Sequence, residues 1–162
     1  MKPKELLDNK SISWKQEIIG GIPCSVTYFK EFRWSWVACQ LNTFIIVGNT
    51  DKQIDKTLIE QFSATCLKYA LKNHKGWPRG LQSAIGSIAI LKGVVITEDA
   101  IGYCEKSSKK HWSAFEFPVV FNSEKKEGTR FKKDPIWGAV FMPYLKNMID
   151  QTLKKLKADS SM

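Results

Sequence analysis

The chain has few of the residues from which reaction centres are usually built. It contains two histidines and four widely separated cysteines, which are His74, His111, Cys24, Cys39, Cys66 and Cys104. Zinc sites and dithiol redox sites need such residues at short, regular spacings, and the chain has no C-x-x-C motif. We therefore expect no metal ion and no cofactor.

Long apolar runs are also missing. The chain starts with a charged segment, residues 1–5, where a secretory signal would continue into ~7–15 apolar residues. The most apolar segment, residues 84–91, is broken by Gly86 and Ser87 and is far shorter than the ~20 residues that span a bilayer. Cysteines without such a leader are expected to stay reduced. The sequence therefore predicts a cytoplasmic protein with no membrane partner.

Arginine and acidic residues are scarce relative to lysine. The formal net charge is +9, and the arginines are Arg33, Arg79 and Arg130. Lysine attracts polyanions diffusely, whereas planar, bidentate recognition of phosphates and bases favours arginine. The charge therefore favours acidic partners but disfavours a protein that reads a base sequence.

The chain does contain enough apolar material to form one compact domain. Of its 162 residues, 43% are hydrophobic and 12% are aromatic, which separates it from disordered chains. We expect a single domain over residues 1–162. Residues 1–10 are expected to form a loose arm, and residues 158–162 a frayed polar tail.

The pattern between residues 14 and 47 predicts three antiparallel strands. Gly20-Gly21 marks a turn, and the run at 24–29 is rich in β-branched and aromatic residues. Trp34 and Trp36 alternate with smaller residues. If they lie on a strand, their rings point to the same face of the sheet.

The rest of the chain alternates between helical and extended patterns. We predict helices at 51–73, 98–105 and 143–157, and strands at 84–96, 114–121 and 129–132. Thr50 and Gln53 resemble a capping box, and Thr97 is a suitable cap for the second helix. Residues 135–142 fit either a helix or a strand. The order predicts an α+β domain with a mixed or largely antiparallel sheet, an N-terminal three-stranded meander and helices packed on one face. The strand order stays open.

The loop between residues 74 and 80 is a candidate ligand-binding segment. Gly76 and Gly80 enclose Trp77 and Arg79, an arrangement that can approach an anion, although the glycine spacing matches no nucleotide-binding fingerprint. Aromatic rings on a sheet face left open by a single helix can line a pocket. We therefore consider Trp34, Trp36, Trp77 and Arg79 as ligand-binding residues. Ordinary core packing is the alternative for the three tryptophans.

A second hypothesis concerns the basic residues late in the chain. If the segment before the strand at 114–121 and the hairpin after it are neighbours, their cations form one face for nucleic acid, with a tryptophan that stacks on a base. The residues of this late basic face are Lys109, Lys110, Trp112, Lys125, Lys126, Arg130, Lys132 and Lys133. A solvated surface is the alternative.

A third hypothesis is an enzyme whose site assembles from dispersed residues, with catalytic residues unknown. Cys104 is its most distinctive residue, because nearby lysines can lower a thiol pKa. The sequence favours a binding or interaction module over this alternative. It leaves open the identity of the ligand or protein partner, the presence of any reaction and the oligomeric state.

Overall fold

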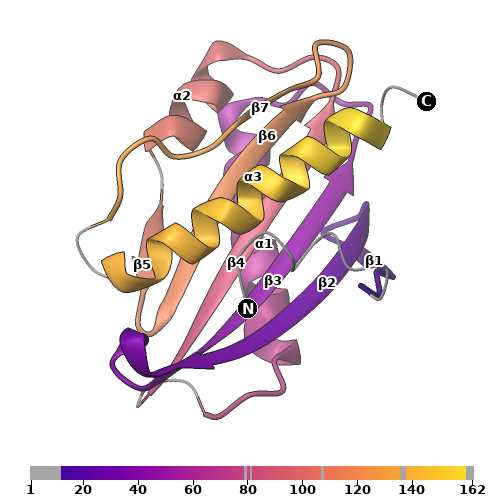
Figure 1. The fold of residues 1–162 in the computed structure, drawn as a ribbon. Helices are drawn as coiled ribbons and strands as arrows, with labels where there is room; N and C mark the ends of the chain where they lie inside the picture. The colour runs from indigo at the N-terminus through magenta and orange to yellow at the C-terminus, as the bar shows by residue number, and fades with distance from the viewer. Residues whose placement is uncertain (1–11, 79, 81, 107, 136–137, 160–162) are drawn as a thin grey trace.

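The computed structural model describes residues 12–78, 80, 82–106, 108–135 and 138–159. Within these ranges, seven strands form one sheet and three α-helices pack against it (Figure 1). The strands are β1 (Lys15–Ile19), β2 (Ile22–Arg33), β3 (Cys39–Asn49), β4 (Ser83–Gly93), β5 (Lys109–His111), β6 (Ala114–Asn122) and β7 (Glu127–Thr129). The helices are α1 (Lys56–Asn73), α2 (Glu98–Lys106) and α3 (Met142–Asp159).

The sheet combines an antiparallel meander with three parallel strands. The strand order is β1-β2-β3-β4-β6-β5, and β7 also pairs with β6. Strands β1, β2 and β3 are mutually antiparallel, whereas β3, β4 and β6 run parallel. Two helical crossovers, through α1 and α2, connect the parallel strands. This arrangement confirms the predicted α+β class, the mixed sheet and the N-terminal meander.

The helices cover both faces of the sheet, which corrects the expectation that they pack on one face. Residues of α1 and α2 share one buried cluster with side chains from the sheet. Residues of α3 form a second cluster with side chains of the opposite face, and Figure 1 shows α3 in front of the sheet with α1 behind it. The reason lies in β4, which is buried along nearly its whole length. A strand buried on both sides needs cover on both sides.

Helix α1 begins later than its sequence pattern predicts. Asp55 is the N-cap, and its carboxylate accepts a hydrogen bond of 2.8 Å from the amide of Leu58. The predicted cap at Thr50 is wrong because residues 51–55 form a bend and an isolated bridge before the helix starts. Ile54 is fully buried and forms an isolated parallel bridge with Ile96. Pairing of this segment therefore delays the start of the helix.

Other boundaries follow the prediction more closely. Thr97 caps α2, since its hydroxyl accepts a hydrogen bond of 3.4 Å from the amide of Ala100. Helix α3 starts at Met142, one residue before Pro143. The residues just before it form the 3₁₀ turn η3 (Ala139–Phe141), so this part of the segment 135–142 is not a strand. Helix α3 continues to Asp159, so the prediction of a frayed tail over residues 158–162 is wrong for its first two residues. The predicted arm at 1–10 and the last three residues lie outside the described ranges.

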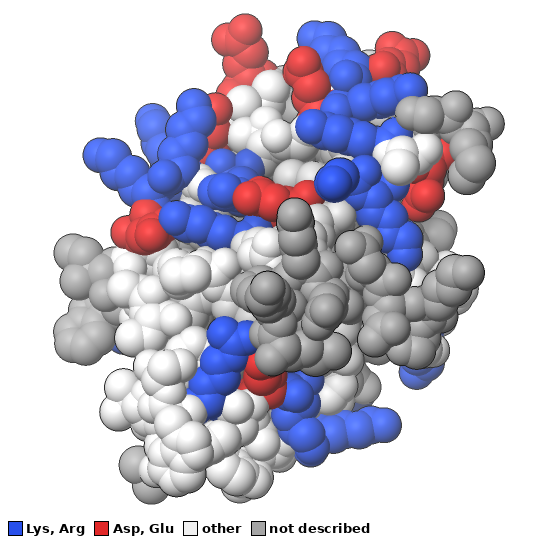
Figure 2. Space-filling view, in the orientation of Figure 1, with Lys and Arg blue, Asp and Glu red and all other residues white. Residues whose placement is uncertain are grey.

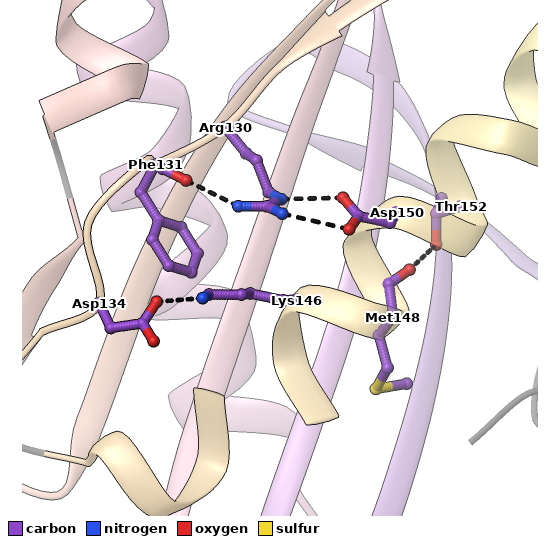
Figure 3. A network of polar contacts seen from close by, with 7 residues as sticks. All are labelled: Arg130, Phe131, Asp134, Lys146, Met148, Asp150 and Thr152. Carbon is purple, nitrogen blue, oxygen red and sulfur yellow. Dashed lines mark hydrogen bonds and ion pairs between the residues drawn. The ribbon is translucent and has the colours of Figure 1, made fainter. Parts of the chain in front are cut away.

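Polar contacts tie α3 to the segment after β7. The Arg130 guanidinium donates to both carboxylate oxygens of Asp150, at 2.8 and 3.1 Å, and to the carbonyl oxygen of Phe131 at 2.8 Å (Figure 3). Lys146 forms an ion pair with Asp134 in the same network. These contacts hold α3 against its face of the sheet.

Among the described residues, no helix is long and apolar enough to cross a bilayer.

Candidate functional site at the amino ends of the parallel strands

Exposed aromatic rings gather at one end of the sheet, where β3, β4 and β6 begin. Phe32, Trp34 and Trp77 come from two segments far apart in the sequence. The ring centroids of Phe32 and Trp34 are 5.2 Å apart, and those of Phe32 and Trp77 are 5.8 Å apart, both in edge-on geometry. Trp34 is 82% exposed and Trp77 is 47% exposed. We call these three residues the aromatic surface.

Trp34 and Trp36 do not point the same way, which corrects the prediction from alternation. They lie in a 3₁₀ turn, η2 (Trp34–Trp36), between β2 and β3, where side chains two positions apart diverge. Trp36 is 4% exposed, and its ring packs edge-on against Phe141 and Tyr144 at 5.3 and 5.1 Å. Arg33 lies 4.7 Å above the same ring. Trp36 is therefore an anchor in the core and no part of an exposed ligand surface.

The backbone after this anchor adopts a strained conformation. Val37 and Ala38 have φ values of 56° and 54°, in the left-handed region. For a β-branched residue this region is a genuine outlier, and it costs roughly 1–2 kcal/mol. Val37 is also 81% exposed, so its side chain gains little from burial. Such strain persists where the surroundings enforce it, and it is typical of functional sites.

The loop that carries Trp77 is held by buried polar side chains of the sheet. The Tyr28 hydroxyl accepts a hydrogen bond from the amide of Lys75 at 3.2 Å, and the Gln40 side-chain oxygen accepts one from the amide of Trp77 at 2.9 Å. Between them, Gly76 lies directly on the side chains of β3. A Cβ at this position would overlap the amide groups of Asn42 and Gln40. A side chain here would have to displace these buried, hydrogen-bonded amide groups or lift the loop from the sheet.

The same network extends into β4. The Ser83 hydroxyl donates to the carbonyl oxygen of Trp77 at 3.1 Å, and Asn42 donates to Ser83 at 3.4 Å. Tyr28 in turn donates to the side-chain oxygen of Asn42. Gln40, Asn42 and Ser83 were not among the candidates expected from the sequence. The available signal was the pair of polar residues, Gln40 and Asn42, at the start of an otherwise apolar strand. Arg79, the predicted anion contact, lies outside the described residues.

A groove of about 560 Å³ lies at the same end, and we call it the end groove. Its lining includes Cys39, Gly80, Ser83, His111, Trp112 and Gly138. Trp112 is 67% exposed. Left-handed backbone gathers around this groove, with φ values of 57° at Gln82, 52° at Ser113, 127° at Gly80 and 79° at Gly138. Four of the five non-glycine residues with a positive φ in the described chain lie near this end, namely Val37, Ala38, Gln82 and Ser113, whereas Lys126 lies in the turn between β6 and β7.

A buried carboxylate lies beside the end groove. Glu116 is 3% exposed, and its Oε2 atom is 2.9 Å from His111 Nε2. The pairing of β5 with β6 brings His111 and Glu116 together. It places both side chains on the face of the sheet that α1 covers. On the same strand, Lys109 forms a 3.0 Å ion pair with Glu60 of α1. Tyr103 and Glu60 keep the Lys109 pKa well above its ordinary value, so Lys109 stays charged.

The four cysteines are unsuited to act as thiolates. Burial raises the pKa of Cys24 to about 11 and that of Cys104 to about 12, and it raises the pKa of Cys66 and Cys39 as well. The prediction that lysines lower the Cys104 pKa is wrong, because the thiol is fully buried. Among the residues that the structure describes, no three His, Cys, Asp or Glu side chains converge in a way that could hold a metal ion.

The late basic face is divided between the two ends of β6. Strand β5, which carries Lys109 and Lys110 and leads into Trp112, pairs with the first residues of β6. The turn with Lys125 and Lys126 follows its last residues. The two pairing regions are centred on Phe115 and Phe121, six positions apart on β6, so the distance between their centres is roughly 20 Å. The two segments are therefore not the close neighbours that this hypothesis required.

The remaining late cations lie among carboxylates. Arg130 pairs with Asp150 at 2.8 Å, and Lys132 pairs with Glu105 at 2.9 Å. Lys133 is exposed next to them. Figure 2 shows basic side chains gathered over the upper part of this view, with acidic side chains between them, and a lower part dominated by uncharged residues.

The structure therefore brings Trp34 and Trp77 together at the surface, buries Trp36 and places Trp112 in an adjoining groove. Comparison of the chain with protein-family models, with curated proteins and with solved structures found no match. Its function is accordingly inferred from this end of the sheet alone.

Proposed function

We propose that the protein is a binding module whose ligand site is the aromatic end, defined as the aromatic surface together with the end groove. The observation that carries this proposal is the exposure of Trp34 and Trp77 on one surface, where buried side chains of the sheet hydrogen bond the backbone of Trp77. Large exposed rings lose favourable burial unless a partner covers them. The protein instead places strained residues and a buried polar network beneath them, as expected of a preorganised site.

The end groove supports the same proposal. Ligand sites combine apolar walls with a few placed polar groups. Here Trp112 and Phe115 provide ring surface, and Ser83, Lys110 and His111 provide polar atoms. The enzyme alternative has less support, because burial keeps the candidate thiol nucleophiles protonated. The proposal includes a reducing, cytoplasmic compartment, which is supported by four cysteines that form no disulfide.

Fluorine NMR tests this proposal and does not require the natural ligand to be identified first. The whole protein is labelled with 5-fluorotryptophan, and each of its six tryptophan signals is assigned by Trp→Phe substitution. It is then titrated with a set of small heteroaromatic compounds, each with and without a phosphate or carboxylate group. We expect the signals of Trp34, Trp77 and Trp112 to shift on binding, while that of the buried Trp36 stays in place.

Trp36 is the matched internal control, because it lies two residues from Trp34 but belongs to the core. The proposal is wrong if none of the compounds shifts the three exposed signals more than that of Trp36. It is also wrong if the largest shifts belong to Trp14, which packs near the end of α3.

A further inference from the structure

Three lysines border the aromatic surface where α1 ends. Lys30 lies on β2 two residues before Phe32, and therefore on the same face of the sheet. Lys75 belongs to the loop that carries Trp77, and Lys72 lies in the last turn of α1. All three side chains are exposed. The aromatic surface is thus bordered by positive charge.

Two carboxylates of the surrounding elements pair with cations, Glu31 with Arg33 at 2.8 Å and Glu60 with Lys109 at 3.0 Å. Their negative charge is compensated locally by these contacts. A third carboxylate, Glu116, is buried at 2.9 Å from His111 and does not face the solvent. The exposed lysines therefore give the solvent-facing side of the aromatic end a positive potential.

The ligand of such a surface must offer flat faces and negative charge together. The cores of protein interfaces are depleted of lysine, which disfavours an apolar protein partner. Duplex DNA offers charge, but its base faces are stacked inside the helix. A single strand offers both features, because its bases can stack on aromatic side chains while its phosphates lie near cations.

We propose that the aromatic end binds single-stranded nucleic acid, with bases stacked on Trp34 and Trp77 and phosphates held by Lys30, Lys72 and Lys75. This inference rests on the proposed function and adds the chemical class of the ligand. Trp112 in the adjoining end groove provides a further exposed ring for the strand. The dominance of lysine over arginine in the chain indicates binding with little base preference.

Fluorescence anisotropy on the full chain tests the proposal. The probes are fluorescein-labelled dT20, a 20-base-pair duplex that carries the same label, and unlabelled dTMP as a competitor. We expect dT20 to bind, the duplex to bind at least tenfold more weakly, and dTMP to compete only at far higher concentration. Trp34→Ala and Trp77→Ala should each weaken dT20 binding by roughly tenfold, the loss expected for one stacked base. Trp34→Phe should retain most of the affinity.

Two triple variants with the same change in net charge separate local contacts from general attraction. The test variant replaces Lys30, Lys72 and Lys75 with Gln. The control variant replaces Lys52, Lys125 and Lys154, which are exposed in other parts of the molecule. For the test variant, the slope of log affinity against log salt concentration should become shallower by about 2, because three phosphate contacts are lost. The control variant should keep the wild-type slope.

Several results overturn the inference. They are the absence of dT20 binding, equal binding of the duplex, full competition by dTMP at the concentration of dT20, and a slope that changes only in the control variant. If dT20 does not bind while heteroaromatic compounds still shift the fluorine signals of Trp34 and Trp77, this inference fails and the proposed function stands. If neither titration affects these signals, both fail.

Discussion

At the residue scale, the most informative positions are those with unfavourable backbone. Val37 combines a left-handed φ of 56° with an exposed β-branched side chain. Neither property favours folding. The residue before Val37 is Trp36, whose buried ring packs against Phe141. We interpret this as stability given up to present Trp34 in a fixed orientation.

Replacing Val37 with Asn should stabilise the protein. Asparagine tolerates the left-handed region, so the substitution relieves strain on the order of 1 kcal/mol. Urea unfolding should show a higher midpoint with an unchanged slope. Val94, also exposed but without a positive φ, is the matched control, and Val94→Asn should have no stabilising effect. A lower midpoint for Val37→Asn would show that this backbone is not strained.

A second prediction at this scale concerns the alkaline stability of the fold. Burial raises the pKa of the Cys104 thiol to about 12, whereas an unfolded thiol ionises near pH 8.5. Above that pH the unfolded state binds fewer protons than the folded state. The contribution of Cys104 is therefore complete below about pH 8.5 and is lost as pH rises towards 12, by up to about 1.4 kcal/mol per pH unit.

Unfolding free energies between pH 8 and pH 10.5 check this sign. The wild-type protein should lose stability with rising pH more steeply than Cys104→Ala. The two proteins are compared by the slope of unfolding free energy against pH. Absolute values are not compared, because the substitution also leaves a cavity that lowers stability at every pH. Parallel curves for the two proteins would contradict the assigned burial of this thiol.

At the element scale, residues 75–77, which follow α1, fix the position of Trp77. Their backbone is hydrogen bonded to Tyr28, Gln40 and Ser83, and it passes so close to β3 that Gly76 has no room for a side chain. The position of the ring therefore depends on packing of the loop against the sheet. A change in the loop should move the ring without unfolding the helix or the strand.

Gly76→Ala should destabilise the protein by about 1–3 kcal/mol, because the loop must lift from Asn42 and Gln40. The fluorine signal of Trp77 should shift, while that of Trp36 does not. Gly102→Ala is the matched control. Gly102 lies in α2 with nothing near an added Cβ, so alanine should stabilise the helix by roughly 1 kcal/mol. Equal effects of the two substitutions would contradict the close approach at Gly76.

Much of this level of structure is predictable from the sequence. The helical periodicity that becomes α1 and α3, and the β-branched runs that become β2 and β4, are recognisable because local pattern and burial agree. The prediction fails where contacts between residues distant in sequence determine the local backbone conformation. The turn at Trp34–Trp36 depends on a left-handed valine that propensity disfavours. The late start of α1 depends on pairing between Ile54 and Ile96, 42 residues apart in sequence.

At the scale of the whole molecule, exposed aromatic rings gather at one end of the sheet. Basic and acidic side chains intermingle over one part of the view in Figure 2, whereas the aromatic end exposes rings. Sequence alone indicated Trp34 and Trp77 as ligand-binding candidates. It did not indicate that they share one surface, because their contact runs through Phe32 and requires β2, β3 and the α1–β4 loop to meet.

A crystallographic fragment screen on the full chain tests the central claim most directly. The aromatic end competes with other hollows of the described chain. They include a groove of about 480 Å³ beside Arg130 and Lys154, one of about 550 Å³ beside Lys56 and Tyr103, and a smaller one of about 220 Å³ beside Trp14. We predict ordered aromatic fragments on Trp34, on Trp77 or in the end groove, away from lattice contacts. Fragments that occupy only the other hollows, with an open and accessible aromatic end left empty, would contradict this account.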